Sequence, residues 1–338
     1  MNQRLVVVEH ESAKHHDAGP VHPECPERMD VIGAVWDTEE IVPFVSRLNA
    51  TAVTTADLLR VHRPEQIKTI QALSSSGGGY IDGDTHVSSS SWDAAIYGAG
   101  SGLTAVSAID RGDADVGFVG VRPPGHHATG HESMGFCLLN NIAVTAAALA
   151  DDGHRVAIID WDVHHGNGTQ DIFWDDPRVL FVSLHQRGIY PGTGHHFERG
   201  GPQSAVGTLN VPLPAGATGD AFTAAFSGLV RRAIERFDPE WILVSAGYDG
   251  HRQDPLASLA LTAGDYADLT DYVVEFASRT KLIMFLEGGY NLRALHESVS
   301  ATARRLIGLP YRGESPSSGG PGRSDVVKIA AEWERAIG

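Results

Sequence analysis

Two short segments carry residues whose types and spacing suit metal chemistry. Asp160, Asp162 and His164 alternate after a β-branched apolar run, so in an extended chain their side chains project to one face. A second apolar run precedes Asp249. Asp162, His164 and Asp249 make the three-ligand set of a catalytic zinc, although iron(II), cobalt or manganese also bind such ligands. Asp-x-Asp alone is typical of a solvated turn; the neighbouring histidines and glycines favour a metal site.

Two further segments suit proton transfer. His126 and His127 follow Pro123-Pro124-Gly125, whose restricted backbone would present both imidazoles, the side chains that titrate near neutral pH. Tyr290 follows another apolar run and the pair Gly288-Gly289, so its phenol could reach the same site. The ordinary alternatives are an exposed histidine pair and a buried core tyrosine.

The elements that must position these residues alternate between strand and helix. Short β-branched runs at 5–8, 116–119, 156–159, 179–183, 242–245 and 282–286 predict buried strands. Helical patterns occupy the intervals, at about 91–106, 141–150, 220–237, 265–278 and 291–307. The pattern predicts an α/β fold with a parallel sheet, and ligands of such sheets lie beyond the carboxyl ends of the strands.

The same pattern continues over residues 1–311 and predicts one catalytic domain rather than two. Residues 312–325 are rich in Gly, Ser and Pro and are interpreted as a linker. Residues 326–338 form an amphipathic pattern, which predicts a short C-terminal helical tail that packs loosely.

Composition excludes several classes of protein. The 338 residues include 26 Lys+Arg and 42 Asp+Glu, a net charge of −16 that disfavours nucleic-acid partners. No apolar run approaches the roughly eighteen residues of a membrane span, and the first residues lack the apolar core of a signal peptide. With only Cys25 and Cys137 present, we expect reduced thiols and a cytoplasmic location.

Taken together, these segments resemble the arginase-deacetylase superfamily and, within it, the zinc-dependent histone deacetylases of the class II type. The resemblance spans about residues 5 to 310. The matching motifs are His22 to Arg28, Arg122 to His127, Gly135 to Asn141, Asp160 to Gly168, Ser245 to Asp249 and Glu287 to Asn291. The resemblance implies a single arginase-deacetylase domain with a mainly parallel eight-stranded sheet flanked by helices.

The resemblance also implies roles for the site residues. Asp162, His164 and Asp249 match the zinc ligands, His127 matches the residue that moves protons, and His126 matches its electrostatic partner. Tyr290 would donate to the oxyanion, Asp160 would orient His126, and Asn167 stands beside His127 where class I relatives carry Asp. A bound potassium ion is implied at Asp160, Asp162, His164, Ser183 and Leu184, and a second monovalent ion near Phe173, Asp176 and Val179.

Substrate-binding positions follow from the same comparison. Gly135 and Phe136 match one wall of the acyl tunnel, and Tyr190 matches the other, where Phe is usual. Arg28 matches an internal-channel residue, Asp84 a carboxylate at the rim, and Leu256 the position that follows an Asp-Pro pair. A hydroxyl at Tyr190 could favour a polar group in the tunnel.

Deacylation of acyl-lysine in a peptide or protein is the leading hypothesis for function. The rival with the same chemistry is deacetylation of acetylated polyamines, whose eukaryotic enzymes carry Glu at the position of Leu256. Small-molecule amides stay open as substrates. An arginase-like binuclear manganese enzyme and a catalytically silent acyl-lysine binding protein are the alternatives from other classes, and a homo-oligomer is compatible with the sequence.

Overall fold

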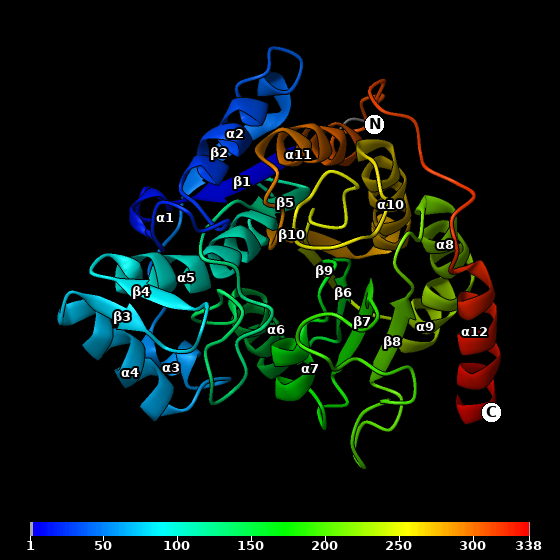
Figure 1. The fold of residues 1–338 in the computed structure, drawn as a ribbon, viewed down its shortest axis with the longest axis horizontal. Coiled ribbons are helices and arrows are strands. Elements are labelled where there is room, and N and C mark those ends of the chain that lie inside the picture. The colour runs from blue at the N-terminus through cyan, green and yellow to red at the C-terminus, as the bar shows by residue number, and fades with distance from the viewer. Residues whose placement is uncertain (1–2, 338) are drawn as a thin grey trace.

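The computed structural model describes residues 3–337 and is built on an eight-stranded sheet in the order β2-β1-β5-β10-β9-β6-β7-β8, with every neighbouring pair parallel (Figure 1). The strands are β1 (Leu5–Glu9), β2 (Val45–Asn49), β5 (Val116–Val119), β6 (Val156–Asp160), β7 (Val179–Gln186), β8 (Thr208–Leu213), β9 (Trp241–Ala246) and β10 (Lys281–Leu286). This confirms the predicted α/β fold with a parallel eight-stranded sheet.

The six predicted strands are all present, and the two that the hydrophobic pattern missed are the edge strands. β2 is largely exposed and carries Arg47 and Asn49, so it lacks a buried apolar run. β8 contains Pro212, a residue that cannot donate a hydrogen bond to a sheet and that occurs in edge strands. Neither strand can therefore be predicted from its own hydrophobic pattern.

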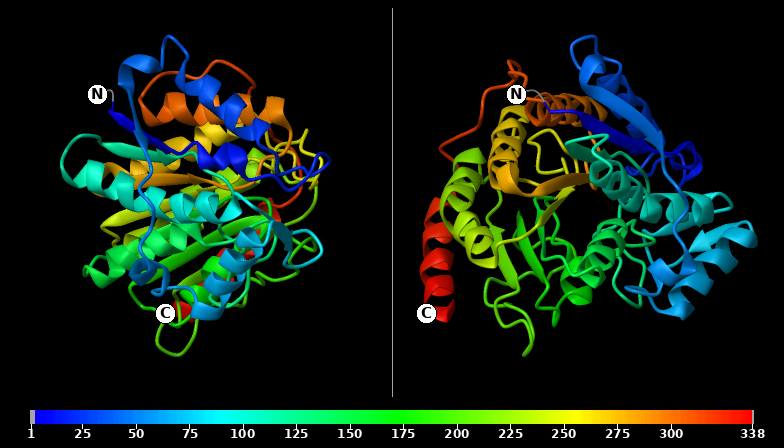
Figure 2. Two further views of the ribbon diagram at one scale, coloured as in Figure 1. Left: turned by 90° about the vertical axis from the view of Figure 1, so that its left-hand side faces the viewer. Right: turned by 180° about the vertical axis from the view of Figure 1, so that it is seen from behind.

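Successive side chains of the strands enter two different cores. In β1, Leu5 and Val7 pack on one side of the sheet and Val6 and Val8 on the other. The first side is covered by α2 (Glu27–Trp36), α8 (Gly219–Ala224), α9 (Arg231–Phe237), α10 (Ala263–Phe276) and α11 (Leu292–Leu306). The second side is covered by α5 (Ser91–Asp110) and α6 (Asn141–Asp151), as the two turned views show (Figure 2).

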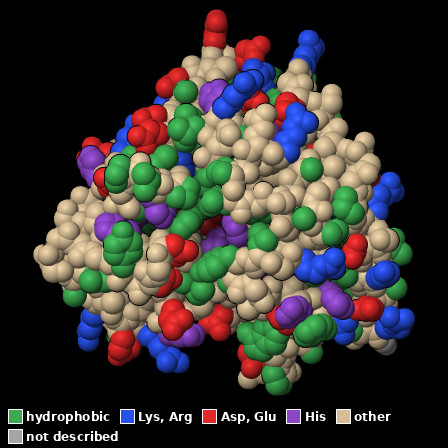
Figure 3. Space-filling model, in the orientation of Figure 1, with side chains coloured by type: hydrophobic (Ala, Val, Ile, Leu, Met, Phe, Trp, Pro, Cys, Tyr) green, Lys and Arg blue, Asp and Glu red, His purple; other side chains and the backbone are tan. Residues whose placement is uncertain are grey.

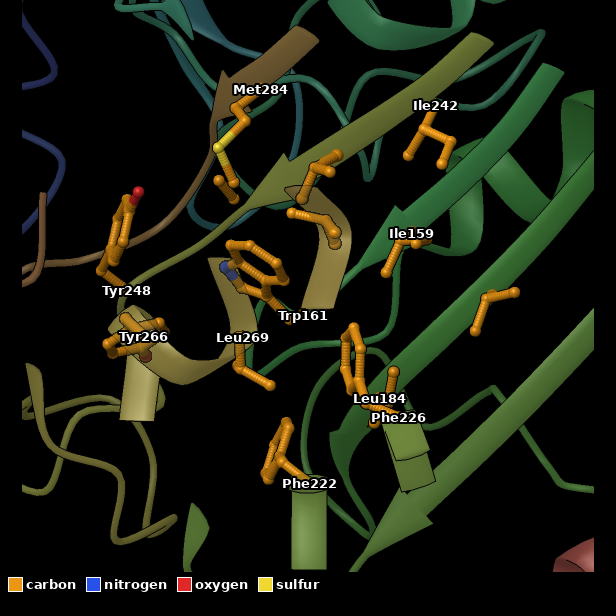
Figure 4. Packing of buried hydrophobic residues seen from close by; sticks show 14 of the residues in the cluster. Ile159, Trp161, Leu184, Phe222, Phe226, Ile242, Tyr248, Tyr266, Leu269 and Met284 are labelled. Carbon is orange, nitrogen blue, oxygen red and sulfur yellow. The ribbon is translucent and has the colours of Figure 1, made fainter. Parts of the chain in front are cut away.

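The first core lies directly under the segment that carries Asp160 to His164. Trp161 is fully buried and packs among Ile159, Leu184, Phe226 and Tyr266 (Figure 4). Phe226 belongs to a π-helical turn, Ala225–Val230, that joins α8 to α9 within the helix predicted at 220–237. Close packing of these large side chains gives the segment a rigid base.

The remaining elements are short or lie at the periphery. They are α1 (Ser12–His15), α3 (Thr55–Leu58), α4 (Pro64–Ser75), α7 (Asn167–Ile172), two 3₁₀ turns (Val42–Phe44 and Ala277–Arg279) and a two-stranded antiparallel sheet of β3 (Gly78–Tyr80) and β4 (His86–Ser88). None of the helices described between residues 3 and 337 is long and apolar enough to span a bilayer.

The C-terminal helix α12 (Arg323–Ile337) packs beside α8 and the edge strand β8. Val326, Ile329 and Trp333 are each less than a tenth exposed and belong to the first core. The expectation that this tail packs loosely is therefore wrong, because one face of the amphipathic helix buries three apolar side chains. The Gly/Ser/Pro-rich segment before it is hydrogen-bonded to the domain at Ser317 and Gly320.

Candidate active site

The predicted site residues gather beyond the carboxyl ends of the central strands β5, β6, β9 and β10. This face of the molecule is hollowed, and histidine side chains are visible in the hollow (Figure 3). A pocket of about 200 Å³ is lined by Asp84, His127, Gly135, Phe136, His164, Tyr190, Leu256 and Tyr290. Segments more than a hundred residues apart in the chain thus meet at one pocket, as parallel sheets permit.

Asp162, His164 and Asp249 lie close enough to share one ion. One ligand atom from each lies within 4.8 Å of the others. Nδ1 of His164 is 3.1 Å from Oδ2 of Asp249 and 3.3 Å from Oδ1 of Asp162. The chain bends over residues 162–164 instead of staying extended. Asp160 therefore faces His126, whereas Asp162 and His164 lie beside Asp249.

The donor set and its surroundings fit a divalent metal. Backbone N–H groups of Val163 and Gly288 donate to Asp249 and Asp162 at 2.9 and 2.8 Å, which orients both carboxylates. A Cβ at Gly288 would lie 2.1 Å from Oδ2 of Asp249, so only glycine leaves room for this carboxylate. Two carboxylates and one imidazole leave further positions for water or substrate, as catalytic zinc requires.

Electrostatics support a cation at this point. Burial and, after it, the charge of Asp162 raise the pKa of Asp249 to about 7, because two buried carboxylates repel each other. Although burial lowers the pKa of His164, hydrogen bonds to Asp162 and Asp249 raise it to about 10. The two carboxylates therefore favour positive charge at this point, which is the charge that a bound divalent metal would supply.

His126 and His127 lie side by side, with ring centroids 4.1 Å apart, but they have different partners. Nδ1 of His126 lies 2.9 Å from Oδ2 of Asp160, whereas Nδ1 of His127 lies 2.7 Å from the amide oxygen of Asn167. Asp160 is the last residue of β6 and Asn167 is the first residue of α7, so the two histidine partners flank the loop that carries Asp162 and His164.

The surroundings shift the pKa values of the two imidazoles in opposite directions. Although burial lowers the pKa of His126, the carboxylates of Asp160 and Asp162 raise it well above its usual value. Burial and the neighbouring His126 and His164 hold the pKa of His127 well below its usual value. His126 is therefore the cationic ring near neutral pH and His127 the neutral ring.

Tyr290 lines the pocket opposite the histidine turn. Its ring meets Phe136 edge to face, with centroids 5.7 Å apart, and Arg28 lies over it at 5.1 Å. Burial raises the pKa of Tyr290 well above its usual value, so the phenol keeps its proton as a donor at neutral pH. Arg28 is fully buried, pairs with Glu24 at 3.0 Å and donates to the backbone carbonyl of Gly289 at 2.8 Å.

The residues expected to contact substrate divide into two groups. Gly135, Phe136, Tyr190, Leu256 and Asp84 all line the pocket. Arg28 is not in that lining; its guanidinium packs against the ring of Tyr290 and holds the backbone of the tyrosine turn through the carbonyl of Gly289. Tyr190 meets His127 edge to face at 5.1 Å, and Leu256 is 38% exposed, so one wall of the pocket is aromatic and its mouth is partly apolar.

The residues expected at potassium sites lie nearby. Asp160 in β6 is paired in register with Ser183 in β7, and Leu184 follows it. All three residues are fully buried. Phe173 and Val179 are also buried, and the carboxylate of Asp176 is paired with Arg178 at 2.7 Å. Potassium at either position stays a prediction.

Two buried carboxylates at the site were not among the predicted functional residues. Oε2 of Glu287 accepts hydrogen bonds from the backbone of Gly125 and His126 at 2.7 and 3.1 Å. Oδ2 of Asp254 accepts from the backbone of Tyr290 at 2.7 Å. Glu287 directly follows β10, and Asp254 begins an Asp-Pro pair. Their hydrogen-bond partners are remote in sequence, so no local pattern predicts their role.

Comparisons with known proteins agree with this geometry. Residues 22–306 match the family model described as "Histone deacetylase domain". A "Probable deacetylase" of Archaeoglobus fulgidus is 38% identical over 85% of this chain and 81% of its own length. A "Histone deacetylase-like amidohydrolase" of Pseudomonas aeruginosa is 38% identical over 80% of this chain and 73% of its own length.

A solved structure extends the likeness to the whole fold. The HD domain of HDA15 superimposes with a TM-score of 0.90 at 34% identity, over 99% of this chain and 96% of that one. Fold and site together define a hydrolase of the deacetylase class. The chain belongs to the histone deacetylase family, within the arginase-deacetylase superfamily.

Proposed function

We propose that this protein removes acetyl or other acyl groups from the ε-amine of acyl-lysine. The observation that carries the proposal is the pocket of about 200 Å³, in which the neutral imidazole of His127 and the phenol of Tyr290 lie around the ring of His164. A slender acyl-lysine side chain can pass between Phe136 and Tyr190, and its amide then reaches the cluster of charged groups.

The proposed mechanism needs a divalent metal, a general base and an oxyanion donor. Asp162, His164 and Asp249 would hold a divalent metal, which we propose to be zinc with iron(II) or cobalt as substitutes; when bound, it would lower the pKa of water and polarise an amide carbonyl. His127 accepts the proton of the attacking water on Nε2, because its Nδ1 is held by Asn167, and returns a proton to the leaving amine. Tyr290 donates a hydrogen bond from its hydroxyl to the developing oxyanion and keeps its proton.

His126 and Asp160 support this step without meeting the substrate. Asp160 keeps His126 cationic, and this charge next to His127 keeps the second ring neutral and able to accept a proton. Potassium beside Asp160, Asp162, His164, Ser183 and Leu184 is proposed as an additional structural ion on the strength of the family resemblance.

Deacetylation of acetylpolyamines is the second candidate. The net charge of −16, with Asp84 at the pocket mouth, suits a cationic substrate of either kind. Leu256 at the mouth favours acyl-lysine, because an apolar side chain at this position cannot pair with a polyamine ammonium as the Glu of the eukaryotic polyamine enzymes would. We also propose the cytoplasm as the compartment, which the two free thiols Cys25 and Cys137 support.

The test is acetate release after zinc reconstitution, comparing an acetyl-lysine peptide with acetylspermidine and acetylputrescine at equal concentration. Asp249→Asn is the metal-deficient control. Preference for the peptide, with Leu256→Glu moving the preference toward the polyamines, supports the proposal. Preference of the wild-type protein for a polyamine would transfer the function to polyamine deacetylation.

A further inference from the structure

A strap of residues 311–320 crosses the N-terminal end of α10 after the match to the family model ends at residue 306. Ser317 donates to Asp265 at the start of α10, and the backbone of Gly320 donates to Thr218 before α8. A Cβ at Gly264 would lie 2.4 Å from the carbonyl oxygen of Glu314. The strap is therefore seated against the domain, and its path depends on the glycine at position 264.

Within the strap, Glu314 reaches the loop that carries Asp249. Oε2 of Glu314 accepts from Nε2 of His251 at 2.9 Å and from the backbone of Ala263 at 3.0 Å, while Oε1 accepts from Arg252. The direction of the histidine bond is fixed, because Nδ1 of His251 accepts from the backbone of Gln253. His251 is only 1% exposed, so this contact is sheltered from water.

The loop 247–256, called here the Asp249 loop, connects the contact between Glu314 and His251 with the active site. His251 donates its backbone N–H to Tyr248, directly before Asp249, and its carbonyl accepts from the backbone of Asp254. Asp254 in turn accepts from the backbone of Tyr290 and Asn291 at 2.7 and 3.1 Å. A displacement of His251 would thus reach both a metal-ligand candidate and the tyrosine turn.

We propose that Glu314 is a positioning residue that holds the Asp249 loop, through His251, in the arrangement that binds metal and places Tyr290. The strap thereby completes the active site from behind, without contacting the pocket. The expected effect on kcat rests on the proposed deacylation, whereas the expected effects on metal affinity and hydrogen exchange are independent of it.

The test compares Glu314→Ala with Glu332→Ala in the 338-residue chain. Glu332 is the matched control, because it also pairs with a histidine, His196 at 3.0 Å, from the same end of the chain but away from the Asp249 loop. Three quantities are measured: hydrogen exchange of residues 247–256 in metal-free protein, affinity for Co²⁺ followed by its absorption spectrum, and kcat and KM for an acetyl-lysine peptide.

For Glu314→Ala we expect faster exchange in the Asp249 loop, about tenfold weaker Co²⁺ binding and about tenfold lower kcat, with KM within about twofold. Glu314→Gln should recover part of the loss, because its amide oxygen still accepts from His251 and Ala263. Co²⁺ affinity and kcat equal to those of Glu332→Ala would overturn the proposal and leave the strap a purely structural element.

A second perturbation covers the case in which Glu314→Ala does not fold. Gly264→Ala moves the strap backbone while Glu314 stays intact, and Gly228→Ala, whose Cβ would meet nothing within 4 Å, is its control. The proposal requires weaker Co²⁺ binding for Gly264→Ala alone; equal binding in both contradicts it. A wild-type protein that binds Co²⁺ but releases no acetate would refute the proposed function, while exchange and metal binding would still decide the role of Glu314.

Discussion

Nδ1 of His127 lies 2.7 Å from Oδ1 of Asn167, and because an amide oxygen only accepts hydrogen bonds, this nitrogen carries the ring proton. Nε2 is therefore the unprotonated nitrogen of the ring. Asn167 fixes the tautomer of the base without adding a negative charge. The neighbouring His126 faces the carboxylate of Asp160 in the equivalent position. This difference in partner contributes to the raised pKa of His126 and the lowered pKa of His127.

Replacing Asn167 with Asp tests the value of that neutral partner. A carboxylate would stabilise the imidazolium form of His127 and raise its pKa. The base form would then be lost at a higher pH, so we expect the acid limb of the kcat/KM profile to move upward by about one pH unit. A profile of Asn167→Asp that overlays the wild-type profile would contradict this explanation.

Tyr290→Phe removes the proposed oxyanion donor while leaving the ring that packs against Phe136. A preorganised donor is worth about 3 kcal/mol in the transition state, so kcat should fall by roughly a hundredfold or more with little change in KM. Tyr272→Phe, a phenol far from the pocket that packs against Phe226, serves as the control. Full activity in Tyr290→Phe would remove this residue from the mechanism.

Asp249→Asn tests the metal group without relying on turnover. The amide removes one of two buried charges, and we expect Co²⁺ or Zn²⁺ affinity to fall by at least 10- to 100-fold, measured by titration of metal-free protein. The matched control is Asp175→Asn, which removes an exposed carboxylate that accepts a hydrogen bond from the backbone N–H of Gln203. Equal metal affinity in both variants would mean that Asp249 is not a ligand.

Stability at mildly acidic pH should depend on His62. Burial lowers the pKa of His62 to about 4, and its Nε2 accepts from the backbone of Asn140. Between about pH 6.5 and 4 the unfolded chain binds a proton here that the folded chain does not, so the free energy of unfolding falls as pH falls. The loss is complete near pH 4 and absent above pH 6.5.

The measurement is urea unfolding at pH 7 and pH 5 for wild-type protein and His62→Gln. From pH 7 to pH 5 the wild-type protein should lose about 2 kcal/mol more than the variant, which has no proton to gain at this position. Other buried histidines, such as His16 and His165, contribute equally to both proteins and cancel in the comparison. Parallel losses would show that His62 is already charged in the folded state.

Much of the site could be predicted from the sequence because its residues follow buried strands directly. Asp160, Asp249 and Tyr290 each stand within a few residues of a β-branched run, and parallel strands bring such positions to one edge. The same reasoning missed β2 and β8, because edge strands lack the continuous apolar run that marks an inner strand.

By itself the sequence determined the fold class, the family resemblance and the candidate groups for metal binding and proton transfer, since these depend on residue types at short spacing. Only the tertiary structure decided which carboxylates hold the site together. Glu287 meets His126 across 161 positions, and Glu314 meets His251 across 63. Such pairs form because the packing of helices and strands brings together groups that are far apart in the sequence. A local sequence pattern contains no information about which distant groups will meet.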